Sequence, residues 1–421
     1  MQDHRAGRQD DARALYRQVL ELDPREPDAW HLLGVLEAES GRYDQAADCI
    51  GRAIEARPGI AMFHNNLGNV CMERGRFDEA KASYVRAIQL EPGRIDAMNN
   101  LGVLLSRRGS PEDAEKLLQA VIALAPAFED AHQNLANHYL REGRLHEAVQ
   151  QCIDGLVVMP RNTTLHEVLV LAYSKLGRPD EAAAVCRSWL ECEPDNAVAA
   201  FHLQGCLGGA VPDRAPDAYV TQVFDGFAAS FDAKLAALSY QAPALVTQAV
   251  QRHAGDPVRT LDVLDAGCGT GLCGPLLAPW AASLCGVDLS TGMLRKAKTR
   301  EVYDRLFRVE LVEFLRQQPA AFDLVASADT LCYFGALEPF ASAAAAALRP
   351  QGLLVFTVES HADEHGAADF VLHGYGRYSH RRRYVESALR AAGLEPIELR
   401  AVELRTEAGD PVHGWLVSAR A

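Results

Sequence analysis

Residues 261–272 read Leu-Asp-Val-Leu-Asp-Ala-Gly-Cys-Gly-Thr-Gly-Leu, an apolar run that ends in Asp265 and is followed by Gly267, Gly269 and Gly271. An apolar run that leads into a glycine-rich turn is typical of a buried parallel strand followed by a helix. Glycine suits such a turn because a Cβ atom would block both the sharp bend and the close approach of a ligand. Exposed amides at the start of the next helix favour polar or anionic groups. The stretch therefore predicts a ligand-binding loop at the end of a strand.

A second short apolar run, residues 283–288, ends in Asp288, which lies 23 residues after Asp265. In a nucleotide-binding βαβ unit, a carboxylate at the tip of the second strand accepts hydrogen bonds from ribose hydroxyls. These two runs resemble the class I S-adenosylmethionine-dependent methyltransferases, whose first motif, Asp/Glu-x-Gly-x-Gly-x-Gly, is complete here. A dinucleotide fingerprint would need Gly or Ala at position 272, where this chain has Leu272. The spacing therefore favours S-adenosyl-L-methionine as cofactor over a nicotinamide or flavin nucleotide.

The composition of the whole chain limits its function. Its 421 residues are enough for two or three domains, and a net charge of −14 argues against non-specific nucleic-acid binding. No apolar run approaches the length of a membrane span, and the first residues lack a signal-peptide core. The ten cysteines form no Cys-x-x-Cys pair and no His/Cys cluster at zinc spacing, so we expect neither a disulfide framework nor a metal site. These features favour a cytoplasmic protein that binds neither nucleic acid nor membrane.

The first half of the chain carries a repeat of 34 residues. Four residue types recur at that spacing: Pro24, Pro58, Pro92, Pro126, Pro160 and Pro194; Gly7, Gly41, Gly75, Gly109, Gly143 and Gly177; Ala12, Ala46, Ala80, Ala114, Ala148 and Ala182; and Leu33, Leu67, Leu101, Leu135 and Leu169. Proline ends the second helix of each pair, glycine provides a left-handed cap on the first, and alanine allows close helix packing. This pattern resembles the tetratricopeptide repeat over about residues 1–207. It implies an all-α solenoid of about five full repeats with partial ends.

Asn66, Asn100 and Asn134 form a shorter ladder at the same spacing, each just before a core leucine. The resemblance implies that they lie on the first helices, which line the concave face of the solenoid. An asparagine offers both a donor and an acceptor, so such a ladder can bind the backbone of a partner protein or peptide. The alternative is that these side chains bond within the array.

A boundary follows the repeats at residues 208–217, which contain two glycines and two prolines. We therefore place a linker at 208–217 and a class I methyltransferase domain at 218–421. Residues 218–253 resemble the helical lid of such enzymes, and Tyr219, Phe224 and Phe231 are the candidate lid residues that fold over the cofactor. The alternative is that these aromatic residues only cover the sheet.

The same resemblance implies the rest of the cofactor site. Residues just after the ribose-binding acid contact the adenine, and Glu310 follows the predicted third strand, 306–309, where an acid accepts from the adenine amine. Glu313 is the alternative at that position. The predicted cofactor residues are Asp265, Gly267, Cys268, Gly269, Gly271, Asp288, Leu289, Met293, Glu310, Leu311 and Asp329.

Candidate catalytic residues follow the carboxyl ends of the later strands, where such sheets bind ligands. Methyl transfer requires a nucleophile held in line, with acid–base help that depends on the substrate. Asp329, at the end of the predicted fourth strand 322–329, and Tyr333 face that region. The sequence 375–380 places His380 in a glycine-rich aromatic loop, and His361 is a further candidate base. The alternatives are that Asp329 orients the cofactor or substrate, that Tyr333 lines the pocket, and that His380 is an exposed loop residue.

The remaining segments complete a seven-stranded mixed sheet. A helix over 340–348 and a stop at 349–352 precede the fifth strand, 353–359, and 394–400 and 414–420 supply the last two strands. The sequence therefore predicts a tetratricopeptide solenoid followed by a Rossmann-like methyltransferase that acts on an unidentified acceptor. The alternatives are an adaptor whose second domain binds the cofactor without turnover, and a nicotinamide-dependent oxidoreductase.

Overall fold

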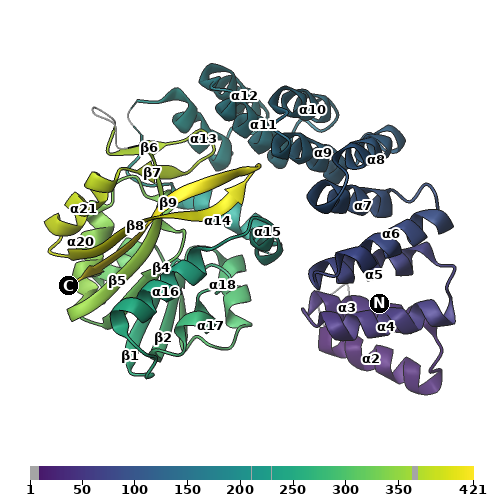
Figure 1. Cartoon of the computed structure of the whole chain (residues 1–421), viewed down its shortest axis with the longest axis horizontal. Coiled ribbons are helices and arrows are strands. Elements are labelled where there is room, and N and C mark those ends of the chain that lie inside the picture. The colour runs from purple at the N-terminus through teal and green to yellow at the C-terminus, as the bar shows by residue number, and fades with distance from the viewer. Residues whose placement is uncertain (1–8, 210, 229, 363–367) are drawn as a thin grey trace. The chain divides into compact units, whose positions relative to one another are not determined.

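A computed structural model describes residues 9–209, 211–228, 230–362 and 368–421 of the chain. Gly7, the first glycine of the repeat ladder, lies outside the described residues. Contacts divide the chain into two compact units. One comprises Met1–Tyr139 and Glu147–Leu165, and the other Leu140–His146 and His166–Ala421. Figure 1 labels most of the elements of each unit.

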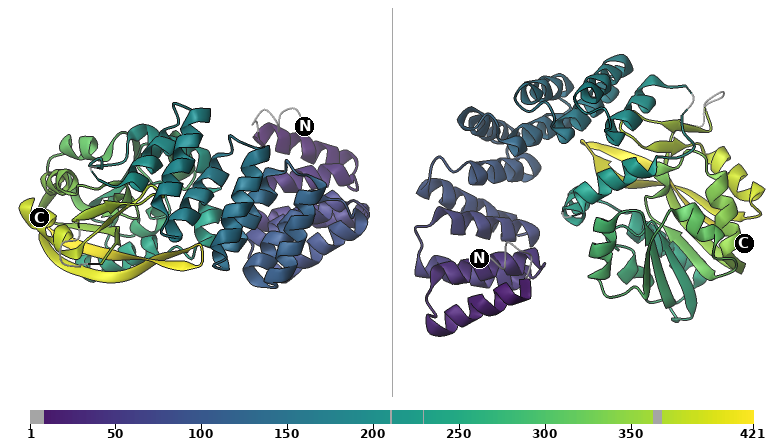
Figure 2. Two further views of the ribbon diagram at one scale, coloured as in Figure 1. Left: turned by 90° about the horizontal axis from the view of Figure 1, so that it is seen from above. Right: turned by 180° about the vertical axis from the view of Figure 1, so that it is seen from behind.

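The repeat region consists of paired helices, visible from two sides in Figure 2. They are α2 (Gln9–Leu22), α3 (Pro27–Glu39), α4 (Tyr43–Ala56), α5 (Ala61–Glu73), α6 (Phe77–Leu90), α7 (Ile95–Arg108), α8 (Pro111–Leu124), α9 (Glu129–Arg141), α10 (Leu145–Val158), α11 (Thr163–Lys175), α12 (Pro179–Cys192) and α13 (Ala197–Leu207). Every ladder proline comes two residues after a second helix, as Pro58 does after α4. The ladder alanines from Ala46 onwards have no exposed surface, so the helices pack closely there.

The ladder glycines end the first helices with one exception. Gly41, Gly75, Gly143 and Gly177 have φ between 68° and 74°, as a left-handed cap requires. Gly109 has φ −148°, so the predicted left-handed cap is wrong at this position. Helix α7 runs on to the residue before Gly109, one residue further than the other first helices run toward their glycine, so Gly109 is the C-cap residue itself and not the residue after it.

In the described residues, the second unit continues after α13 with three helices that precede a nine-stranded sheet, and further helices connect the strands of that sheet. The helices are α14 (Asp217–Phe227), α15 (Phe231–Ala237) and α16 (Ala242–Ala254). The strands are β1 (Leu261–Ala266), β2 (Ala281–Asp288), β3 (Arg305–Arg308), β4 (Phe322–Ser327), β5 (Leu348–Ser360), β6 (Phe370–Leu372), β7 (Tyr378–His380), β8 (Glu395–Glu407) and β9 (Asp410–Arg420). The fifth strand begins five residues before its predicted start, because Leu348 already pairs with Phe322.

Seven of these strands form the expected mixed sheet. Strands β3, β2, β1, β4 and β5 are parallel neighbours in that order, β9 lies antiparallel beside β5, and β8 pairs with β9. The two three-residue strands β6 and β7 form a small hairpin at the carboxyl end of β5. The chain reverses its strand order between β1 and β4, and ligands bind outside the carboxyl ends of strands at such a point.

Helices cover both faces of the sheet, as Figure 1 shows. Helices α19 (Leu311–Arg316), α20 (Glu338–Ala347) and α21 (Arg382–Ala391) pack on one face, against residues such as Leu264. Helices α16 and α17 (Gly274–Leu277) pack on the other, against residues such as Val263. Because neighbouring residues of β1 face opposite cores, the strand reads as a continuous apolar run in the sequence.

Candidate active site

The glycine-rich loop after β1 is folded tightly against its neighbours. Gly267 and Gly271 have φ of 75° and 81°, a region that favours glycine. A Cβ atom on Gly267 would lie 2.2 Å from Oγ1 of Thr330, and one on Gly271 would lie 2.9 Å from the Tyr303 ring. These two glycines are therefore required by the packing of the protein itself.

Gly269 has a different environment, with open space where a side chain would project. Its φ is 54°, and the atom nearest to an ideal Cβ is Cε1 of Phe231, 4.0 Å away. Its amide donates to Oδ2 of Asp288 at 2.9 Å, and the amide of Ser290 donates to Oδ1 at 2.8 Å. Burial raises the pKa of Asp288, although these amides oppose the shift. The loop and the carboxylate thus form a cradle for a hydroxyl-bearing ligand.

Asp265 lies inside the protein at the end of β1. Its Oδ2 accepts a 2.6 Å hydrogen bond from the hydroxyl of Tyr303, a residue that carried no signal in the sequence. Burial raises the pKa of Asp265 to about 7, against the opposing effect of that hydrogen bond. The Asp265 carboxyl therefore has a structural role and holds Tyr303, whose ring packs against the glycine-rich loop.

The raised pKa of Asp265 predicts a stability that falls with pH. A carboxyl that keeps its proton longer in the folded state contributes most below its unfolded pKa, and the contribution is lost as pH rises through the folded value. We expect the free energy of unfolding to fall between about pH 4 and 7 by on the order of 3 kcal/mol from this group. Urea unfolding of Asp265→Asn across that range should show a flatter profile than Asp262→Asn, a control in the same strand. Equal profiles for the two variants would contradict the assignment.

The predicted adenine-side residues lie after β2 and β3. Met293 is fully buried in the first turn of α18 (Thr291–Lys298), while Leu289 is half-buried. Glu310 caps α19 through an Oε2 that accepts from the amide of Glu313 at 2.8 Å. Its Oε1 is buried and has no hydrogen-bond partner among the described residues, although Nε of Arg214 lies 4.0 Å away. That oxygen can accept from a ligand amine.

The three lid candidates lie in two different environments: Phe224 and Phe231 contact each other near the glycine-rich loop, whereas Tyr219 is buried away from it. Phe224 meets Phe231 edge-on at 5.9 Å and Tyr333 at 5.4 Å, measured between ring centroids. Phe231 is also the residue nearest to the open side of Gly269. Tyr219 lies deeper, with its hydroxyl donating to the carbonyl of Gly376 at 3.3 Å.

Two aspartates fasten the lid helices to the cofactor loops. Oδ1 of Asp225 accepts from the hydroxyl of Ser290 at 2.5 Å and from the amide of Gly292 at 3.0 Å. Asp232 accepts from the hydroxyl of Thr270 at 2.5 Å and from Arg300 at 2.6 Å. The Phe-Asp pairs at 224–225 and 231–232 therefore each supply an aromatic ring and an anchor.

Asp329 lies two residues beyond β4, at the carboxyl edge of the sheet. It has φ 57°, which is unusual for a residue other than glycine and is common at functional sites. Its Oδ2 accepts from Arg405 at 2.6 Å, whereas the buried Oδ1 has no hydrogen-bond partner among the described residues. Burial raises the pKa of Asp329, although Arg405 opposes the shift.

Asp329 belongs to a larger buried cluster of charges. Arg405 also pairs with Glu359, and Arg377 pairs with both Glu359 and Glu407. Burial raises the pKa of Glu359, but the two arginines outweigh it and the net shift is downward. The cluster has three carboxylates and two guanidinium groups, so the carboxylate with the raised pKa, Asp329, is the one best suited to exchange a proton.

The other candidate bases lie in different settings. Tyr333 is half-buried, and burial raises the pKa of its hydroxyl well above the usual value. His380 is fully buried on β7, with Nε2 3.1 Å from the carbonyl of Gly335, and burial lowers its pKa to about 4. His361 contacts the hydroxyl of Ser379 at 3.0 Å. Of these residues, Tyr333 is the one in contact with the lid.

The asparagine ladder lies in the first unit and bonds within the array. Asn66 lies 2.8 Å from Nε2 of His31, Asn100 donates to Asn65 at 3.2 Å, and Asn134 donates to Asn99 at 3.0 Å. These contacts occupy part of the hydrogen-bonding capacity of each amide.

Known proteins resemble both halves of the chain. Residues 264–356 match the model of a methyltransferase domain, and residues 4–65, 59–127, 99–157 and 134–197 match models of the tetratricopeptide repeat. The malonyl-[acyl-carrier protein] O-methyltransferase of Geobacter sulfurreducens is 31% identical over 43% of this chain and 71% of that protein. The ubiquinone biosynthesis O-methyltransferase of Idiomarina loihiensis is 30% identical over 38% and 69%. Human methyltransferase-like protein 27 is 36% identical over 23% and 38%.

The match to the methyltransferase model covers the glycine-rich loop and strands β2, β3 and β4. The sheet and the helices on its two faces define a Rossmann-like fold, and the relatives place the chain more narrowly. The chain belongs to the methyltransferase family and carries tetratricopeptide repeats before the methyltransferase domain, as predicted. It spans 38% of the length of the human relative and about two thirds of the length of the bacterial ones. In the described residues, no helix is long and apolar enough to cross a membrane.

Proposed function

We propose that the protein is an S-adenosylmethionine-dependent methyltransferase with a repeat module that recognises a partner or the substrate. The observation that carries this proposal is the pairing of Asp288 with the open side of Gly269. The carboxylate is held by two backbone amides, and it lies beside a loop position where the protein leaves space. We keep the domain limits at 1–207 and 218–421, with the lid at 218–253.

The residues present fit the cofactor. Asp288 would accept from the ribose hydroxyls, and Oε1 of Glu310, which has no hydrogen-bond partner among the described residues, would accept from the adenine amine. The space at Gly269 would take the part of the cofactor that a side chain would exclude. Phe231 and Phe224 would exclude water above it. The bound cofactor supplies an electrophilic methyl group.

The acceptor would lie at the carboxyl edge of β4. The bacterial relatives are named for transfer to oxygen, so we propose a hydroxyl or carboxyl oxygen as the acceptor atom. A hydroxyl needs a base, and the free Oδ1 of Asp329 can accept its proton because burial raises the pKa of this carboxyl. Tyr333 would position the acceptor from the lid side. Arg405 would hold Asp329 in place through its other oxygen.

Calorimetry with S-adenosylhomocysteine and with NAD tests the cofactor. We expect saturable heat with the first compound and none with the second, because Leu272 replaces the small residue of a dinucleotide loop. No heat with S-adenosylhomocysteine would overturn the proposal. A nicotinamide-dependent oxidoreductase would give the opposite pattern. An adaptor without catalytic activity would bind S-adenosylhomocysteine. It would not convert S-adenosylmethionine to S-adenosylhomocysteine when hydroxyl or carboxyl acceptors are added.

Weakening the lid anchors should weaken cofactor binding without unfolding the sheet. The double variant Asp225→Asn and Asp232→Asn removes the charge from both anchors, which are partly exposed. We expect the affinity for S-adenosylhomocysteine to fall about tenfold, since hydrogen bonds to charged groups are worth roughly 1.5–3 kcal/mol when buried and less when exposed. Hydrogen exchange over α14 should accelerate. Asp217→Asn, at the exposed start of the same helix, is the control, and equal effects would contradict the anchoring role.

A further inference from the structure

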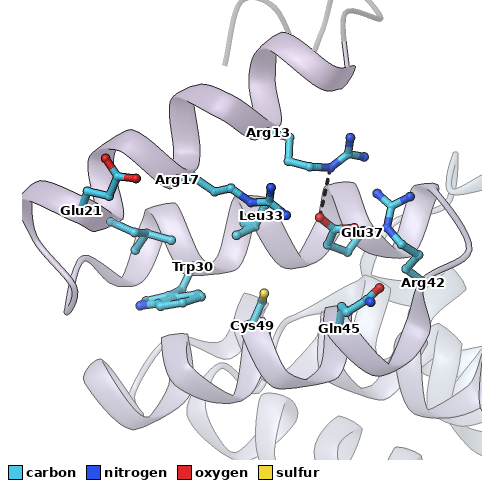
Figure 3. A pocket seen from close by; sticks show the side chains of 10 residues that line it. Arg13, Arg17, Glu21, Trp30, Leu33, Glu37, Arg42, Gln45 and Cys49 are labelled. Carbon is cyan, nitrogen blue, oxygen red and sulfur yellow. Dashed lines mark hydrogen bonds and ion pairs between the residues drawn. The ribbon is translucent and has the colours of Figure 1, made fainter.

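A groove in the first repeat unit carries features that methyl transfer does not use. It lies among α2, α3 and α4, has a volume of about 710 Å³ and is open to solvent (Figure 3). Three arginines line it: Arg13 and Arg17 from α2, and Arg42 from the start of α4. None of the asparagines of the repeat ladder lines this groove. It is therefore a separate surface from the ladder.

The three arginines differ in how far the protein satisfies them. Glu37 is buried between Arg13 and Arg42 and pairs with the Nε atom of each, as Figure 3 shows for Arg13. Arg13 is further engaged by Asp10 and by the hydroxyl of Ser40. The guanidinium of Arg13 thus has partners on each of its nitrogens.

Arg17 and Arg42 keep free donors. Among the described residues, no carboxylate or hydrogen-bond acceptor pairs with Arg17, whose side chain is exposed. Arg42 uses Nε for Glu37, and its two terminal nitrogens have no partner in the described part of the chain. Glu37 and Asp10 balance the charge of two of the three arginines, so Arg17 and the terminal nitrogens of Arg42 are the donors left for a ligand. Guanidinium groups with free forks bind carboxylates in a bidentate manner.

The opposite end of the groove is largely apolar. Leu20 and Leu33 form part of its wall with exposed fractions of 8% and 5%, and half-buried Trp30 lies beside them. Glu21 stands at this end, two helical turns from Arg13. A ligand must therefore combine carboxylates at the arginine end with an apolar group near Trp30.

We infer that this groove binds an acidic peptide segment of a partner protein, with carboxylates on Arg17 and Arg42 and an apolar side chain against Leu20, Leu33 and Trp30. Charge complementarity favours this occupant, because Arg17 and the terminal nitrogens of Arg42 face the groove without an acidic partner among the described residues. A nucleic acid is disfavoured, since the apolar wall at Leu20, Leu33 and Trp30 would face its charged backbone. The inference does not depend on methyl transfer.

The test is fluorescence anisotropy of the full chain with a fluorescein-labelled peptide, Glu-Glu-Leu-Glu-Glu. We expect saturable binding that weakens with salt, and no binding of Lys-Lys-Leu-Lys-Lys. Arg17→Glu should weaken binding by about tenfold or more, and Arg17→Lys should have an intermediate effect because it keeps the charge but loses the fork. Arg86→Glu is the matched control, with the same charge change at an exposed position of α6 outside the groove.

Each other outcome would overturn the inference. Equal losses in Arg17→Glu and Arg86→Glu would mean non-specific attraction, and tighter binding of an oligothymidylate of equal charge would mean a nucleic-acid surface. If the wild-type protein did not bind the acidic peptide, the groove would not be a binding site for acidic peptides. The helical circular dichroism signal and the thermal unfolding of Arg17→Glu should match the wild type, which shows that the repeat helices are folded, and calorimetry with S-adenosylhomocysteine should also be unchanged. A failure of peptide binding is thereby distinguished from a failure of the proposed methyltransferase.

Discussion

Replacing Asp288 by asparagine should reduce the affinity for S-adenosylhomocysteine by about 100-fold, because hydrogen bonds to a charged group are worth roughly 1.5–3 kcal/mol each. Both oxygens of the carboxylate accept from backbone amides, those of Gly269 and Ser290. An asparagine must turn its NH₂ group toward one of these donors, whichever way it is oriented. The variant therefore loses the charge and also disturbs the loop that frames the ligand.

The matched control is Asp323→Asn, in β4 of the same sheet. Asp323 also accepts from a backbone amide, that of Asp262 at 2.8 Å, and pairs with Arg349 at 2.7 Å. It lies at the amino end of its strand, away from the ligand-binding edge. We expect the affinity of Asp323→Asn for S-adenosylhomocysteine to stay within about threefold of the wild type, a difference of less than roughly 0.7 kcal/mol. If calorimetry gave Asp288→Asn the same affinity as this control, the ribose-binding assignment would be wrong.

The sequence predicted the features that local backbone demands impose. The ladder glycines and prolines mark where helices end, and Gly267 and Gly271 mark positions where no side chain fits. Such demands act on single residues and so leave a signal at fixed spacing. Gly109 shows the limit of this reasoning, because the length of the neighbouring helix decided its conformation.

Residues that act through distant partners left no such signal. Arg405 pairs with Asp329, which lies 76 residues earlier, and no motif on its strand marks it. The Phe-Asp pairs were visible in the sequence, yet the anchoring role of Asp225 depends on Ser290, 65 residues away. Tyr303 reaches Asp265 across 38 residues in the same way. Only the packing of the sheet brings these groups together.

Gly267 and Gly269 should respond in opposite ways to the addition of one methyl group. Gly267→Ala places a Cβ 2.2 Å from Oγ1 of Thr330 in a left-handed backbone, so we expect the free energy of unfolding to fall by about 2–4 kcal/mol. Gly269→Ala adds its methyl group to open space, and the cost to folding should be only about 1 kcal/mol from the backbone. Its cost to cofactor affinity should be large, roughly 10- to 100-fold, because the methyl group fills the cradle.

Thermal unfolding and calorimetry on both variants separate the two effects. A second substitution, Thr330→Ala, removes the atoms that Gly267→Ala would meet, so the double variant should recover part of the lost stability. The same substitution should leave the affinity of Gly269→Ala unchanged, since Thr330 is not among the atoms near that position. If Gly269→Ala bound S-adenosylhomocysteine as tightly as the wild type, the ligand would not occupy the space beside this glycine. The cofactor would then have to bind elsewhere along the carboxyl edge of the sheet, and Asp288 would not be the residue that binds its ribose.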